Sequence, residues 1–186
     1  LISQQLFHSY FLSISATVLM SLDGLSLVMS RTALLDIFLS FFLLLSFYFL
    51  VTHRLWLMSL TMGLALGTKW SAIYVLAALG VYLLISQRKI IQTTIQCAVI
   101  PFIVYVASWF GWFLSDKGWS RDFSSNPIIS WIHYHREILN FHTGLTTEHS
   151  YEASAWNWLV LGRPTSFYYS TPKTCGASSC SQEVLA

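Results

Sequence analysis

The chain has 186 residues, of which 55% are hydrophobic, 16% aromatic and only 10% charged, with a formal net charge of +2. Soluble domains carry roughly 25% charged residues, so this composition and a mean hydropathy of +0.59 exclude a soluble domain and predict an integral membrane protein. The basic residues form no cluster of the kind that binds a phosphate backbone, which excludes nucleic acid as a partner.

The chain begins without Met and inside an apolar segment that has no basic region ahead of it. We therefore expect an internal fragment of a longer protein, and no signal peptide is inferred. Residues 6–22 form the first apolar run and are just long enough to cross a bilayer, which takes about 20 residues. Residues 21–33 mix polar and apolar side chains, so we expect a loop or a short interfacial helix there.

Residues 34–51 are almost purely Leu and Phe and predict a second membrane helix, with one acid, Asp36, near its start. The next apolar run, residues 55–85, is too long for one straight crossing. Two helices broken near Gly67 and Lys69 fit better, because glycine lowers helix propensity and a single helix would bury the lysine in lipid. Residues 90–113 predict a fifth span with a kink at Pro101.

The basic turns predict the orientation of these spans. Arg54 lies between the second and third helices, and Arg88 and Lys89 lie between the fourth and fifth, which places all three on one side. That side is cytoplasmic by the positive-inside rule. The chain then divides into a membrane region, residues 1–113, and an extracytoplasmic loop, residues 114–186.

Three charged residues, Arg31, Asp36 and Lys69, fall together on the outer side in this topology. A charge at membrane depth costs a few kcal/mol unless it is paired or hydrated, so each needs an explanation. One interpretation is a structural ion pair of Asp36 with Arg31 or Lys69. The other is that at least one of the two cations remains available to hold a phosphate group at the membrane surface.

The outer loop contains a predicted amphipathic helix that starts with the cap Asn126 and Pro127 and ends at Gly144. Its helically spaced residues, which we expect to lie on the bilayer, are Trp131, His135, Ile138, Leu139 and His142. His135 and His142 share a face but lie two turns apart, a spacing that argues against a metal site, and none is predicted.

Cys175 and Cys180 bracket a short Gly-Ala-Ser-Ser turn on the predicted outer side, where disulfides are permitted. A disulfide between them is one possibility and two free thiols the other. Cys97 lies within the fifth span, where cysteine serves as a small apolar residue.

Three motifs carry a resemblance to a known family. They are the run Ser30-Arg-Thr-Ala-Leu-Leu-Asp36, the break Gly63-Leu-Ala-Leu-Gly67-Thr-Lys69-Trp-Ser71, and the segment from Asn140 to Pro164 with its His149-Ser-Tyr151 and Trp156-Asn-Trp158. Together they resemble the protein O-mannosyltransferase family in its actinobacterial form. Family members usually read His-Pro-Tyr where this chain has His149-Ser150-Tyr151, a departure that affects loop rigidity more than function.

The resemblance implies an all-α, polytopic helical bundle of the GT-C type in the cell membrane, with an outward-facing active site. It implies inverting transfer of mannose from a polyprenyl-phosphate-mannose donor to Ser or Thr of exported proteins, which makes the export machinery a candidate partner. No cofactor is expected. It also implies that the catalytic acidic pair lies upstream of Leu1 and that further helices follow Ala186, so this fragment is expected to be inactive alone.

Within the chain, the implied transfer would use cations for the leaving phosphate, and we assign Arg31, Lys69 and Arg163 to that role. His149 and Tyr151 are predicted to shape the sugar or acceptor cleft. Two alternatives stay open: another GT-C transferase with a polyprenyl-phosphate sugar donor, and a non-enzymatic transporter or assembly subunit whose broken helices line a path.

Overall fold

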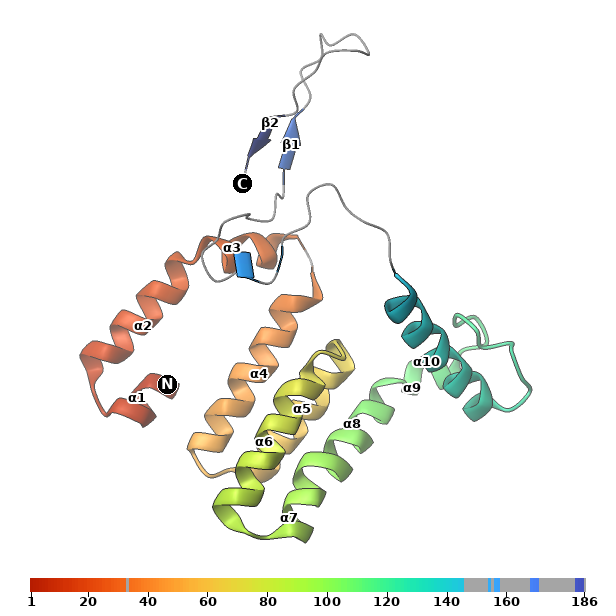
Figure 1. The fold of residues 1–186 in the computed structure, drawn as a ribbon, viewed down its shortest axis with the longest axis horizontal. Coiled ribbons are helices and arrows are strands. Elements are labelled where there is room, and N and C mark those ends of the chain that lie inside the picture. The colour runs from red at the N-terminus through yellow and green to blue at the C-terminus, as the bar shows by residue number, and fades with distance from the viewer. Residues whose placement is uncertain (33, 146–153, 155, 158–167, 171–182, 186) are drawn as a thin grey trace. The chain divides into compact units, whose positions relative to one another are not determined.

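The computed structural model describes residues 1–32, 34–145, 154, 156–157, 168–170 and 183–185. These residues divide into two compact units, Leu1–Trp131 and Ile132–Ala186. This division follows packing, whereas the predicted division after residue 113 separates membrane from outer residues and stays a prediction. In its described residues the first unit consists of helices and the turns that join them (Figure 1).

The helices follow one another along the chain with short connections. They are α1 (Ile2–Phe7), α2 (Tyr10–Leu22), α3 (Gly24–Arg31), α4 (Leu35–Val51), α5 (Leu55–Thr68), α6 (Ala72–Gln87), α7 (Ile90–Thr94), the π-helical turn η1 (Ile95–Val99), α8 (Ile100–Ser108), α9 (Phe110–Leu114) and α10 (Pro127–Gly144). The predicted break after Gly67 and the predicted bounds of α10 are confirmed.

In its described residues the second unit holds most of α10 and a pair of short strands that the sequence did not predict. Strand β1 (Tyr168–Ser170) pairs antiparallel with β2 (Glu183–Leu185), and Tyr169 lies opposite Val184. Strands of three residues leave the protein mainly helical, as predicted. The bilayer position proposed for α10 is a separate prediction.

The first predicted helix is interrupted near its start. His8 has a left-handed backbone with φ 50° and closes α1. Ser9 then caps α2, because its Oγ accepts a hydrogen bond from the Leu12 N–H at 3.4 Å. At the other end of α2, Asp23 caps α3 by accepting from the Ser26 N–H at 2.8 Å. The residues after α2 therefore form a short helix, one of the two structures predicted there.

Helices α4, α5 and α6 enclose the buried apolar core. Its side chains come from α5 and α6 and are Met58, Met62, Leu76, Leu79 and Leu83. A buried hydrogen bond between the hydroxyls of Ser46 and Thr61, 2.7 Å apart, joins α4 to α5. Each hydroxyl also donates to or contacts a carbonyl of its own helix, so both are satisfied inside an apolar interface.

Helix α5 lies against α8 through two glycines. A Cβ atom on Gly63 would come within 2.5 Å of the Val104 Cβ, and one on Gly67 within 3.0 Å of the Ser108 Oγ. Two small residues four apart let helix backbones approach closely, a common arrangement in membrane bundles. The C-terminal end of α5, which precedes Lys69, therefore lies close to the C-terminal end of α8.

Segments α7, η1 and α8 form one helical stretch from residue 90 to 108. Among the described residues it is the one helix long and apolar enough to cross a membrane; α2, α4, α5 and α6 are apolar but shorter. The predicted kink at Pro101 stays a prediction, but the helix is irregular nearby, because the π-helical turn η1 ends two residues before the proline. A wider turn accommodates a residue that lacks an N–H and whose ring would collide with the carbonyl four residues back.

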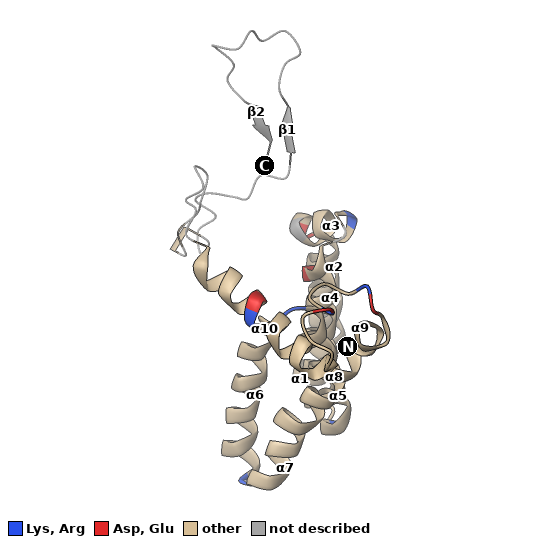
Figure 2. Ribbon diagram, turned by 90° about the vertical axis from the view of Figure 1, so that its right-hand side faces the viewer, with Lys and Arg blue, Asp and Glu red and all other residues tan. Residues whose placement is uncertain are grey.

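The helices of the first unit carry few charges along their length (Figure 2). Many of their large apolar side chains are exposed. Exposed examples from six helices are Phe11, Phe38, Phe41, Trp56, Ile73, Ile91 and Phe102. Exposed apolar surface of this extent is typical of contact with lipid or with further protein.

Candidate functional site

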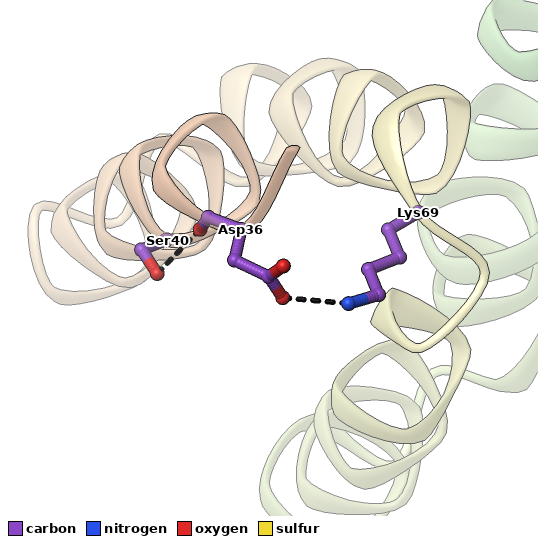
Figure 3. Close-up of polar contacts among 3 residues, drawn as sticks. All are labelled: Asp36, Ser40 and Lys69. Atoms are coloured by element: carbon purple, nitrogen blue, oxygen red, sulfur yellow. Dashed lines mark hydrogen bonds and ion pairs between the residues drawn. The ribbon is translucent and has the colours of Figure 1, made fainter. Parts of the chain in front are cut away.

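The Asp36 carboxylate and the Lys69 ammonium form an ion pair at one end of the helices (Figure 3). Asp36 lies in the first turn of α4, where an acid is favoured by the positive end of the helix dipole. Lys69 directly follows α5 and has an extended backbone, φ −156° and ψ 133°. Its Nζ donates to the Asp36 Oδ1 at 2.7 Å.

This pair remains open to other ligands. The side chains of Lys69 and Asp36 are 46% and 40% exposed, so neither is enclosed by the described protein. An ammonium has three donors and the described contact with Asp36 uses one of them, which leaves capacity for an anion such as a phosphate. Exposed ion pairs in water contribute only about 0.2–1 kcal/mol, so Lys69 can exchange partners at little cost.

Arg31 lies in the last turn of α3, where a cation complements the negative end of the helix dipole. It is exposed, and among the described residues it forms no ion pair. Of the two partners considered for Asp36, the structure therefore brings Lys69 into contact. The guanidinium of Arg31 is left for a ligand or solvent.

The other predicted site residues lie outside the described part of the chain. They are Arg163, His149, Tyr151 and the two cysteines, Cys175 and Cys180. Their assigned roles, and the alternative of a disulfide or two free thiols, stay predictions.

Sequence reasoning missed that Trp70, the residue after Lys69, contacts an aromatic cluster of Tyr105, Trp109 and Trp131. Trp70 follows Lys69, and its indole N–H donates to the Tyr105 hydroxyl at 2.9 Å. The Tyr105 ring contacts Trp109 and Trp131, with centroids 6.3 and 6.4 Å away. Nothing in the sequence pairs the break after α5 with a tyrosine of α8, although the density of aromatic residues around position 109 was a signal for an organised region.

The segment after α9, the start of the predicted outer loop, folds back on α9. The Trp112 indole N–H donates to the Trp119 carbonyl at 3.1 Å, and the Arg121 guanidinium lies 5.5 Å from the centroid of the Trp112 ring. Buried Ser130 accepts from the Ser124 N–H at 3.0 Å, which ties the loop to the first turn of α10. These contacts hold the polar segment after the long helix in a defined conformation.

In its described residues the protein is mainly helical, with one helix long and apolar enough to cross a membrane and a partly exposed ion pair at one end of its helices. The model of the family described as dolichyl-phosphate-mannose-protein mannosyltransferase matches residues 1–141. Because this match covers most of the chain, the chain belongs to that family. The family resemblance seen in the sequence is confirmed.

Curated relatives support this assignment. The chain is 27% identical to the polyprenol-phosphate-mannose--protein mannosyltransferase of Corynebacterium glutamicum, over 99% of this chain and 48% of the relative. It is 27% identical to the protein of the same name from Mycobacterium tuberculosis, over 89% and 44%, and 26% identical to that of Mycolicibacterium smegmatis, over 99% and 48%. The chain thus spans about half the length of the curated relatives it matches. No solved structure matches it.

Proposed function

We propose that the whole protein is a protein O-mannosyltransferase, which moves mannose from polyprenyl-phosphate-mannose to Ser or Thr of exported proteins. The observation that carries this proposal is the family match over residues 1–141. The printed names of the relatives, all polyprenol-phosphate-mannose--protein mannosyltransferases, support the choice of donor and of a protein acceptor.

The proposed setting is the cell membrane, with several crossing helices of a GT-C bundle and residues 114–186 on the outer side. The exposed apolar surfaces of α2, α4, α6 and α8 support a lipid environment. The four shorter apolar helices have 13 to 17 residues. At 1.5 Å per residue they cover roughly 20–25 Å of a hydrocarbon core about 30 Å thick, so polar chain at their ends would lie near the interface.

In the proposed reaction the bond between the anomeric carbon of mannose and the phosphate oxygen breaks, and a bond to the acceptor hydroxyl oxygen forms on the opposite face. The hydroxyl proton would go to a carboxylate, which we expect upstream of Leu1. Polyprenyl phosphate leaves and gains negative charge at the departing oxygen. Fixed cations near that oxygen would stabilise the transition state more than the ground state.

Arg31 and Lys69 are the cations of this chain that we assign to the leaving phosphate. Arg31 has no acidic partner among the described residues, and Lys69 keeps unused donors beside Asp36. Asp36 would orient the Lys69 side chain before the donor binds. Arg163 is proposed as a further cation, and His149 and Tyr151 as residues of the sugar or acceptor cleft.

The test uses the purified whole protein in lipid nanodiscs with radiolabelled polyprenyl-phosphate-mannose and a Ser/Thr-rich peptide from an exported protein. Labelled peptide should form, and a matched peptide with Ala in place of each Ser and Thr should stay unlabelled. Transfer from a polyprenyl-phosphate-arabinose donor in place of the mannose donor would point to another GT-C transferase. No transfer from either donor would contradict an enzymatic role and favour the transporter or assembly alternative.

The proposed topology makes a separate prediction for the whole protein in cells. A reporter fused after Lys89 is expected to be active in the cytoplasm, because the basic turn after α6 is retained inside. A reporter fused after Asn126 is expected to be active outside. The reverse pattern would move Arg31 and Lys69 to the cytoplasmic side and remove them from an outward-facing donor site.

A further inference from the structure

The Lys69 side chain lies in the short break between α5 and α6. Residues 69–71 separate α5 from α6, and the extended Lys69 is tied by its N–H to the Ala65 carbonyl at 3.0 Å. Its carbonyl accepts from the Ala72 N–H at 3.1 Å. Such a break sets the direction of the lysine side chain only if neighbouring contacts hold it.

The next residue supplies such a contact. Trp70 and Tyr105 are both half-buried, and the indole N–H donates to the tyrosine hydroxyl at 2.9 Å. That hydroxyl also hydrogen-bonds the Trp109 side chain. The Tyr105 ring is in turn packed in the aromatic cluster with Trp109 and Trp131. The hydroxyl therefore joins the break to the aromatic cluster of the first unit.

Helices α5 and α8 are also in close contact at their C-terminal ends. A Cβ on Gly67 would lie 3.0 Å from the Ser108 Oγ, so the last turn of α5 is held directly against the last turn of α8. Ser108 lies about one helical turn after Tyr105, and its hydroxyl donates to the Tyr105 carbonyl at 2.6 Å. The close packing of Gly67 against the Ser108 side chain and the Trp70–Tyr105 hydrogen bond together restrict the position of the Lys69 backbone.

We propose that Tyr105 is a positioning residue for Lys69: its hydroxyl holds Trp70, and through the break it aims the ammonium toward Asp36 and the phosphate of the lipid donor. This inference rests on the proposed function and names a further residue of the same site. Tyr105 acts through Lys69 and does not itself touch the reacting atoms.

The test is Tyr105→Phe in the whole enzyme, which removes the hydroxyl and keeps the ring that packs on Trp109 and Trp131. kcat/KM for polyprenyl-phosphate-mannose should fall about tenfold, because small misplacements of a positioned group lower the rate steeply. KM for the acceptor peptide should stay unchanged. Trp70→Phe, which removes the donor of the same bond, should have a similar effect.

The readout that separates positioning from general damage is the combination with Lys69→Gln. Once the ammonium is absent its direction no longer matters, so Tyr105→Phe should cause no further loss in that background. Tyr74→Phe, an exposed tyrosine of α6, is the matched control and should retain full activity. If Lys69→Gln is fully active, the proposed phosphate role of Lys69 fails. If Lys69→Gln is impaired and Tyr105→Phe is fully active, or lowers activity equally in both backgrounds, the positioning role alone is overturned.

Discussion

Replacing Arg31 or Lys69 by Gln in the whole enzyme is expected to slow mannose transfer by roughly 30-fold or more, about 2 kcal/mol in transition-state terms. The reason is electrostatic: the departing phosphate gains charge as its bond to mannose breaks, and each cation stabilises that charge. The measurement is kcat/KM for the lipid donor in nanodiscs. Arg54→Gln, an exposed base in the turn between α4 and α5, is the matched control and should change little.

The same substitutions should affect protein stability only slightly. Lys69 and Asp36 are both 40% exposed or more, so an Asp36 left alone can be hydrated. Arg31 has no acidic partner among the described residues, so its loss leaves no unpaired acid there. We expect the protein level and Tm of both variants to stay close to those of the unmodified enzyme.

The double variant Lys69→Gln/Asp36→Asn decides between the two interpretations of this pair. If Lys69 only neutralises Asp36, removing both charges should recover most of the lost activity. If Lys69 holds the donor phosphate, the second change cannot replace the missing cation and activity should stay low. Full recovery in the double variant would reject the phosphate role and leave a structural pair.

Much of the helical framework could be predicted from local signals. The break near Lys69 follows from an apolar run too long for one crossing and from two glycines beside a lysine. The bounds of α10 follow from an Asn-Pro start and a glycine end; the Asn126 Oδ1 accepts from the Ile128 N–H at 2.9 Å, as a cap should. These signals act between residues close in the chain, so the helix ends they determine can be predicted from the sequence.

The contacts that build the site could not be predicted, because they depend on packing between distant helices. Asp36 pairs with Lys69 and not with Arg31 because of how α4 packs against α5. The buried Ser46–Thr61 hydrogen bond helps to set that packing. The bond from Trp70 to Tyr105 joins residues 35 positions apart. The same limit applies to η1, since a proline predicts an irregular helix without specifying a π-helical turn.

The close approach of α5 and α8 predicts that Gly63→Ala destabilises the protein. The new Cβ would lie 2.5 Å from the Val104 Cβ, 2.8 Å from its Cγ1 and 3.0 Å from the Pro101 carbonyl oxygen, so the helices must separate. Overpacking of this kind costs about 1–3 kcal/mol. The better helix propensity of alanine returns at most about 1 kcal/mol, so the net effect should be a lower Tm in detergent.

Two further variants identify the cause. Gly111→Ala, on α9, adds the same methyl group where no other atom lies within 4 Å, and its Tm should match or slightly exceed that of the unmodified protein. Gly63→Ala combined with Val104→Gly removes both Val104 atoms that collide and should restore part of the lost stability. It should also restore part of the transfer activity, because α5 carries Lys69 at its end and can again lie against α8. A Gly63→Ala variant as stable and active as Gly111→Ala would contradict the close contact between α5 and α8. It would also contradict the claim that this contact fixes the Lys69 backbone.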